Sequence, residues 1–203
     1  MQSYDIKTKN ADGFDEHVWK INSVKQVAEN RIFKTLEINA FLPSKNIERN
    51  FVGMEMNNWV HVYAETKAGD VILVKQHRIG SNEVTYEVPA GTVEAGEDPC
   101  VAAERELREE TGYVPEMMEF LGEFSANPAI QTNKVYIYWA HKCHKVEDLH
   151  LDEAEDIEVV LATQDDISDI MENVGAAKFK VTHALSQLAI LRGALASALG
   201  GDE

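Results

Sequence analysis

The stretch that decides the fold runs through the middle of the chain and reads Gly91-Thr-Val-Glu-Ala-Gly-Glu97-Asp-Pro-Cys-Val-Ala-Ala-Glu-Arg105-Glu106-Leu-Arg-Glu109-Glu110-Thr-Gly112-Tyr113. It predicts a helix from about Pro99 to Thr111, because Asp98 is a good N-cap, proline suits the first helical position and Gly112 suits a left-handed C-terminal cap. The face formed by Cys100, Ala103 and Leu107 is small and apolar. We expect that face to pack on a sheet and to hold the helix still.

Three acids occupy the other face of this predicted helix. Glu106, Glu109 and Glu110 stand at i, i+3 and i+4, positions whose Cβ atoms lie about 5–6 Å apart. Such like charges repel one another, and a hard cation would relieve the repulsion. Carboxylates without His or Cys ligands suit magnesium, which also bridges to substrate phosphates and can assist cleavage of a diphosphate. A merely solvated, Glu-rich helix face is the alternative interpretation.

The whole pattern resembles the box of the Nudix family. That box is Gly, five residues, Glu, seven residues, Arg-Glu, an aliphatic residue, any residue, Glu-Glu, any residue, Gly and an aliphatic residue. This sequence matches every fixed position, and it departs from the box only at the last position, where Tyr113 replaces the aliphatic residue. The resemblance implies that Glu106 and Glu110 are the principal metal ligands, with Glu109 beside them. It also implies a further ligand from the backbone carbonyl of Ala90, and a pairing of Glu97 with Arg105 that orients the box.

The rest of the chain supports an α+β fold. Strands are expected at residues 24–27, 32–42, 47 onward, 59–66, 71–77, 84–88, 135–141 and 157–163. A short helix capped by its own Asp is expected at 165–173, and a longer amphipathic helix at 178–199, with an apolar stripe of Val181, Leu185, Leu188, Ile190, Leu191 and Leu195. The resemblance implies a Nudix fold, an α/β/α sandwich with the mixed sheet between helices. We expect residues 1–53 to form a small N-terminal antiparallel β unit involved in dimerisation, and residues 54–203 to form the Nudix hydrolase domain.

The resemblance extends to the branch that hydrolyses ADP-ribose and similar nucleoside-diphosphate sugars. Val74-Lys-Gln-His-Arg78 and Tyr86-Glu87-Val-Pro-Ala-Gly91 look like the approach to the box in that branch. Arg78 would contact the substrate diphosphate, since a planar guanidinium suits phosphate oxygens, and Glu87 would assist at the metal or the substrate. Pro128 stands where relatives that cleave ADP-ribose carry a proline.

Two more features are implied by this branch. The acidic segment Asp152-Glu153-Ala-Glu155-Asp156 resembles the loop that supplies its remaining acids. Glu155 would be a further magnesium ligand, and Glu153 would position or deprotonate the water. Relatives form homodimers whose N-terminal strands exchange and stack aromatic side chains on the nucleobase; Phe33 and Phe51 occupy comparable places, although a core position is the alternative for each.

Composition limits the partners. The formal charge of -16 would repel nucleic-acid phosphates and an anionic membrane surface, so neither is expected as a partner. No secretory signal or apolar span of about 18 residues is present, which favours a cytoplasmic protein. The two cysteines, Cys100 and Cys143, indicate neither a disulfide framework nor a zinc site and are expected to be buried, and the seven histidines show no ligand or triad spacing.

Three functional hypotheses follow. The first is a Mg²⁺-dependent hydrolase, with Mn²⁺ as an alternative ion, that converts a nucleoside-diphosphate sugar and water into a nucleoside monophosphate and a sugar phosphate. The second keeps the mechanism and changes the substrate to a nucleoside triphosphate or a dinucleoside polyphosphate. The third is a Nudix-fold sensor that binds ADP-ribose without cleaving it; the intact box and the absence of a basic module in the sequence weigh against it.

Overall fold

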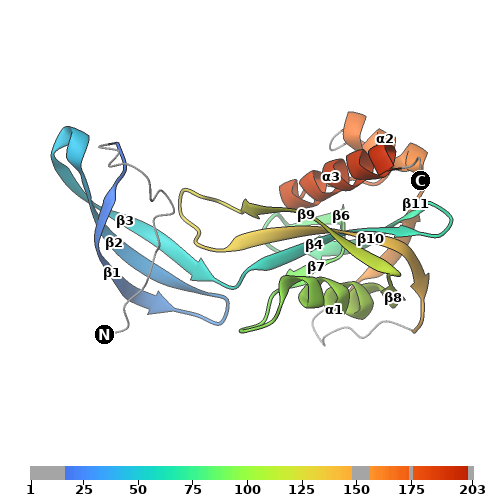
Figure 1. Ribbon diagram of the computed structural model, residues 1–203, viewed down its shortest axis with the longest axis horizontal. Helices are drawn as coiled ribbons and strands as arrows, with labels where there is room; N and C mark the ends of the chain where they lie inside the picture. The colour runs from blue at the N-terminus through green and yellow to red at the C-terminus, as the bar shows by residue number, and fades with distance from the viewer. Residues whose placement is uncertain (1–16, 148–155, 174–175, 201–203) are drawn as a thin grey trace. The chain divides into compact units, whose positions relative to one another are not determined.

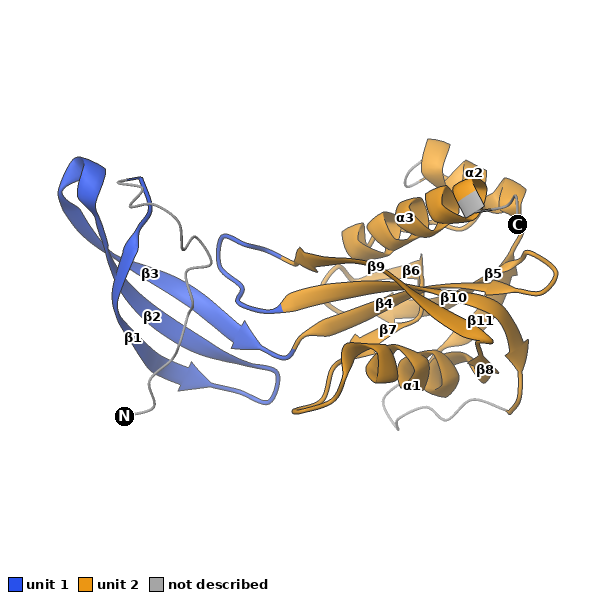
Figure 2. Cartoon of the chain, in the orientation of Figure 1, with its two compact units in different colours: residues 1–57, 127–133 blue, residues 58–126, 134–203 orange. Residues whose placement is uncertain are grey.

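The computed structural model describes residues 17–147, 156–173 and 176–200. The chain divides into two compact units, which Figure 2 shows in different colours. Unit 1 comprises Met1–Asn57 and Asn127–Asn133, and unit 2 comprises Asn58–Ala126 and Lys134–Glu203.

Unit 1 is built on a three-stranded antiparallel sheet of β1 (Lys20–Glu29), β2 (Phe33–Leu42) and β3 (Ile47–Met56), in that order. A 3-10 turn at Pro43–Lys45 joins β2 to β3, and Asn46 beside it has a left-handed φ of 51°, which Asn tolerates better than most residues. The N–H of Met54 donates to the Ile130 carbonyl at 2.7 Å, and the N–H of Thr132 to the Met54 carbonyl at 3.0 Å. These bonds tie segment 127–133 to β3. The expected N-terminal antiparallel unit is confirmed.

Unit 2 contains an eight-stranded mixed sheet. Its main order is β11-β5-β4-β10-β8, with β6 beside β5, β7 beside β4 and β9 beside β10. Strands β4 and β10 run parallel, whereas β5 and β7 are antiparallel to β4. The strands are β4 (Trp59–Thr66), β5 (Val71–Arg78), β6 (Glu83–Glu87), β7 (Ala90–Thr92), β8 (Tyr113–Val114), β9 (Met117–Ser125), β10 (Lys134–Lys145) and β11 (Glu158–Ala162).

Helices cover both faces of this sheet, as Figure 1 shows: α1 (Pro99–Thr111) lies on one face, and α2 (Gln164–Glu172) and α3 (Ala184–Gly200) on the other. The apolar core is divided accordingly. One cluster joins Val60 and Val62 of β4 to Leu107 of α1, and the other joins Tyr63 of β4 to Ile190 of α3. The α/β/α arrangement expected of a Nudix fold is confirmed.

Helix boundaries differ from expectation at two places. The last helix begins at Ala184 and not near residue 178, because the segment before it is hydrogen-bonded to β6 through Tyr86 N–H and the Lys180 carbonyl. Val181 therefore lies outside the helix, and Leu191 and Leu195 of the expected apolar stripe are each 53% exposed.

Helix α2 has a different cap from the one expected. Its N-cap is Thr163, whose side chain accepts from the Asp166 N–H, while the Asp166 side chain accepts from the Thr163 N–H. This is a reciprocal capping box, so the expected Asp cap was wrong. Strands β7, β8 and β9 were not anticipated. No helix in the described part of the chain is long and apolar enough to cross a membrane.

Candidate active site

Helix α1 is fixed at both ends and along one side. The Asp98 carboxylate accepts from the Cys100 N–H at 2.8 Å, and Gly112, at φ 74°, donates its N–H to the Arg108 carbonyl. Leu107 is fully buried together with Ala102 and Ala103. Both predicted caps and the predicted bounds are confirmed. Cys143 is buried, as expected, whereas Cys100 is only half-buried and packs against the edge of the same apolar cluster.

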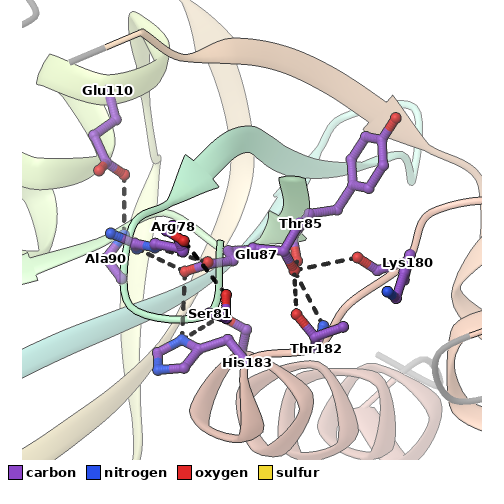
Figure 3. Close-up of polar contacts among 11 residues, drawn as sticks. Arg78, Ser81, Thr85, Glu87, Ala90, Glu110, Lys180, Thr182 and His183 are labelled. Carbon is purple, nitrogen blue, oxygen red and sulfur yellow. Dashed lines mark hydrogen bonds and ion pairs between the residues drawn. The ribbon is translucent and has the colours of Figure 1, made fainter. Parts of the chain in front are cut away.

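The acidic face of α1 is turned toward strand β7. Glu110 is 7% exposed, and its Oε2 accepts from the Ala90 N–H at 3.0 Å (Figure 3). The Glu106 carboxylate lies directly against Gly91, where a Cβ atom would overlap it. Glu109 is more open, with 46% of its side chain exposed. The structure therefore brings three predicted metal-site residues, Ala90, Glu106 and Glu110, together around one short strand.

Arg105 links these acids to the loop before the helix. Its Nε and Nη2 donate to the two carboxylate oxygens of Glu97 at 3.0 and 3.1 Å, which confirms the expected pairing. Its Nη1 donates to Glu106 at 2.9 Å and to Glu109 at 3.1 Å. The bond from Arg105 lowers the pKa of the Glu97 carboxyl, and its partners raise the pKa of Arg105. One guanidinium thus offsets the repulsion among several acids.

The donor set fits an oxygen-ligated divalent cation. Within the described residues, no three His, Cys, Asp or Glu side chains already stand in a metal-holding group, which agrees with the present pairing of Glu106 to Arg105 and of Glu110 to the Ala90 N–H. The carboxylates are the hard ligands that Mg²⁺ prefers. The close approach of Glu106 to Gly91 holds one of them at the strand. Glu153 and Glu155, the two loop acids expected here, lie outside the described residues.

A hollow of about 540 Å³ lies beside α1, within the size range of small-molecule sites. Arg105 and Glu109 belong both to this hollow and to the acidic face. Arg108 and Glu147 form a close ion pair in its lining. The remaining lining residues are Val101, Glu104, Val114 and Pro115.

A second charged group involves Arg78, at the end of β5, and Glu87, at the end of β6. Arg78 donates from Nε to Glu87 Oε1 at 2.8 Å and from Nη2 to Oε2 at 2.7 Å, and the Glu87 side chain is fully buried. His183 Nδ1 lies 3.3 Å from the same Oε2 (Figure 3). Burial alone would raise the pKa of Glu87, but Arg78 and His183 outweigh it and hold this pKa at about 2. Glu87 is therefore a charged anchor for Arg78.

His183 is the residue that sequence reasoning missed. It precedes α3 and meets Glu87 only through tertiary structure, so no local spacing could have revealed the contact. Its ring also lies near that of His61, which is 2% exposed. Burial is the main reason that the pKa of His61 falls to about 3.

The other three expected substrate residues lie in unit 1. Phe33 begins β2, and Pro128 is an exposed residue of segment 127–133. Phe51, on β3, is 41% exposed and makes an edge-to-face contact with Trp19 at a centroid distance of 4.9 Å. Phe51 is thus an accessible aromatic side chain and not a core residue.

Comparison with known proteins places this geometry in a family. A model of the NUDIX domain matches residues 57–184. The methanol dehydrogenase activator of Bacillus methanolicus is 32% identical over 148 residues, which cover 72% of this chain and 80% of that protein. The ADP-ribose pyrophosphatase of Bacillus subtilis (strain 168) is 34% identical over 130 residues, covering 64% and 70% respectively. The chain belongs to the Nudix hydrolase family.

A solved structure shows the same fold. The crystal structure of an ADP compounds hydrolase superposes with a TM-score of 0.76 at 23% identity, covering 91% of this chain and 97% of that one.

Proposed function

We propose that this protein is a magnesium-dependent hydrolase that splits the diphosphate bond of ADP-ribose or a related nucleoside-diphosphate sugar. The observation that carries the proposal is the carboxylate face of α1, held against β7 by Gly91 and Ala90 and tied to the loop before the helix by Arg105. The name of the Bacillus subtilis relative, ADP-ribose pyrophosphatase, supports the substrate class. Water adds to one phosphorus atom and the bond to the bridging oxygen breaks, which gives a nucleoside monophosphate and a sugar phosphate.

The chain's own residues divide the work. Glu106 and Glu110, with the Ala90 carbonyl and Glu155, would hold the cation, and Glu109 would stand beside it. Mg²⁺ held there would supply an activated water and would neutralise the charge that develops on the bridging oxygen; Mn²⁺ is the alternative ion. Glu153 would orient or deprotonate the water. Arg78, anchored by Glu87, would orient the diphosphate.

Unit 1 supplies the proposed base-binding and dimerisation surface. Residues 1–53 are expected to mediate a homodimer in which the two copies exchange their N-terminal strands. Phe51 supports this role, because an aromatic ring exposed on a strand can stack on a nucleobase. Phe33 and Pro128 are proposed to complete the same substrate contacts.

A substrate panel tests the proposal. Purified protein with Mg²⁺ is offered ADP-ribose, another nucleoside-diphosphate sugar, dGTP and a diadenosine polyphosphate, and products are separated by ion-exchange chromatography. We expect AMP and ribose 5-phosphate in equal amounts from ADP-ribose, with slower turnover of the last two compounds. Faster hydrolysis of dGTP or of the dinucleotide would favour the second hypothesis, and tight binding of ADP-ribose without products would favour the sensor.

A further inference from the structure

The segment that precedes α3 is clamped to β6 by the backbone bond from Tyr86 to Lys180 and by the buried side chain of Thr85. Thr85 is 1% exposed, and its hydroxyl donates to the Lys180 carbonyl at 3.2 Å. It accepts from both the N–H and the hydroxyl of Thr182, each at 3.1 Å. A hydroxyl has one hydrogen and two lone pairs to offer, so this set of contacts uses its full capacity.

The clamp delivers His183 to the buried carboxylate of Glu87 (Figure 3). His183 Nδ1 is 3.3 Å from Glu87 Oε2 and 3.3 Å from the hydroxyl of the buried Ser186. The imidazole lies against His61, with ring centroids 5.4 Å apart. Since the ionised carboxylate can only accept, Nδ1 carries the hydrogen in this contact. Three neighbours, Glu87, Ser186 and His61, therefore hold the ring beside the Glu87 carboxylate.

The orientation of Glu87 determines the orientation of Arg78. The bidentate pair occupies the guanidinium edge formed by Nε and Nη2, which turns the edge carrying Nη1 away from the carboxylate. A guanidinium is planar, and its grip on a phosphate depends on the plane in which it is held. A rotation of the Glu87 carboxylate would therefore tilt the phosphate-binding edge of Arg78.

We propose that His183 is a positioning residue for the substrate diphosphate, acting on Arg78 through Glu87. The inference rests on the role of Arg78 in the proposed function. A positioning role differs from a purely structural role in one respect. If His183 positions Arg78, its loss weakens diphosphate binding through Arg78, whether or not the fold is also destabilised.

Kinetics of His183→Ala give the first test. We expect KM for ADP-ribose to rise about tenfold, as for loss of a hydrogen bond to a charged group, while kcat stays within about twofold because ground-state and transition-state binding fall together. His183→Asn keeps an N–H near the Nδ1 position and should restore most of the affinity. His183→Leu, which keeps apolar packing on His61, replaces the alanine variant if that one does not fold. His144→Ala, at an exposed histidine of β10, is the matched control and should match the wild type.

A double-mutant cycle shows whether the effect passes through Arg78. In an Arg78→Ala background, His183→Ala should leave KM unchanged, whereas a purely structural effect would raise it by the same factor in both backgrounds. An equal rise in both backgrounds, or no rise in the wild-type background, would overturn the inference.

The binding affinity for Mg²⁺-pyrophosphate, measured by calorimetry, tests the role of His183 independently of which nucleoside-diphosphate sugar is the substrate. We expect about tenfold weaker binding in His183→Ala than in the wild type, again without an added effect in the Arg78→Ala background. If the wild type hydrolyses no nucleoside-diphosphate sugar but shows this pattern, the substrate proposal fails and the positioning role stands. Equal pyrophosphate affinity in wild type and His183→Ala overturns the positioning role.

Discussion

Glu106 and Glu110 are held by different means, and this determines how each can serve a cation. Glu110 is nearly buried and accepts from the Ala90 N–H, whereas Glu106 is paired with Arg105 and pressed against Gly91. The two acids are thus held on α1 by different neighbours.

Replacing these acids by their amides tests the metal site. Glu106→Gln and Glu110→Gln should each lower kcat at least about 100-fold, because a neutral amide is a poorer ligand for Mg²⁺ than a carboxylate. This loss exceeds the roughly 10–100-fold that is typical when a residue that only hydrogen-bonds a metal ligand is removed. Circular dichroism should show an intact fold. Glu172→Gln, at an exposed position of α2, is the control. Near-native turnover by both site variants would exclude the assigned ligands.

Gly91 provides a more selective test. A Cβ at this position would overlap the Glu106 carboxylate, and this flexible group can move aside at little cost to the fold. We expect Gly91→Ala to keep a melting temperature near that of the wild type but to need at least about tenfold more Mg²⁺ for half-maximal activity. An unchanged Mg²⁺ requirement would show that Glu106 is not held at the cation by this contact.

How far the residues could be predicted depends on where their partners lie in the chain. Arg105 and the acids of α1 lie on one helix, where helical geometry fixes which side chains meet. The pairing of Glu97 with Arg105 followed from the family resemblance. The contact between His183 and Glu87 joins distant segments through the Thr85 clamp. No pattern in the sequence signals it, because it arises only when the segment before α3 is laid beside β6.

At the scale of elements, strong local signals set the boundaries well. The predicted and observed bounds agree for α1 and for β4, whose ends carry caps and turn residues. The start of α3 was misplaced because its helical periodicity continues through residues 178–183, which tertiary hydrogen bonds to β6 hold out of the helix. Short strands such as β7 depend on their neighbours in the sheet and leave little trace in composition.

The packing of α3 on the sheet depends on Gly193. A Cβ there would overlap the ring of Tyr63, which is fully buried on β4, and a buried ring cannot move aside as the Glu106 carboxylate can. We expect Gly193→Ala to lower the free energy of unfolding by about 1–3 kcal/mol, the usual cost of overpacking a core. Urea titration measures it, with Gly80→Ala as the control because nothing lies within 4 Å of a Cβ at Gly80. Equal stability of both variants would contradict this packing.

The capping box of α2 predicts a pH dependence. Hydrogen bonds from Lys178 and from Thr163 lower the pKa of Asp166 to about 2 from an ordinary value of 3.8. Its contribution to stability is therefore complete above about pH 3.8 and is lost as the pH falls toward 2. Asp166→Asn should cost roughly 1 kcal/mol at neutral pH, and the deficit should shrink at pH 3. Denaturant unfolding at pH 7, 5 and 3 measures it; a deficit that grows on acidification would contradict the assignment.

At the scale of the whole molecule, the two units differ in how much core they possess. Both large apolar clusters lie in unit 2. Among the described residues of unit 1, the buried apolar side chains are Leu36, Ala40 and Leu42, while Ile21, Val27, Ile32, Phe51, Val52 and Ile130 are exposed. A three-stranded sheet needs a covered apolar face for independent stability. The sequence predicted the strands of unit 1 as short extended runs between turn residues, but it gave no sign of how many of their apolar side chains would be exposed.

The proposed homodimer would supply that cover, and it predicts a concentration dependence confined to unit 1. If a second copy covers β1–β3, then dilution below the dissociation constant should speed hydrogen exchange of their amides, because a segment with little core of its own opens readily. Amides of α1 and β4, which lie against the apolar clusters of unit 2, should exchange at the same rate at every concentration. Sedimentation should show twice the mass of one chain at the high concentration. A monomer at all concentrations, with slow exchange throughout β1–β3, would remove the dimer and with it the proposed strand exchange.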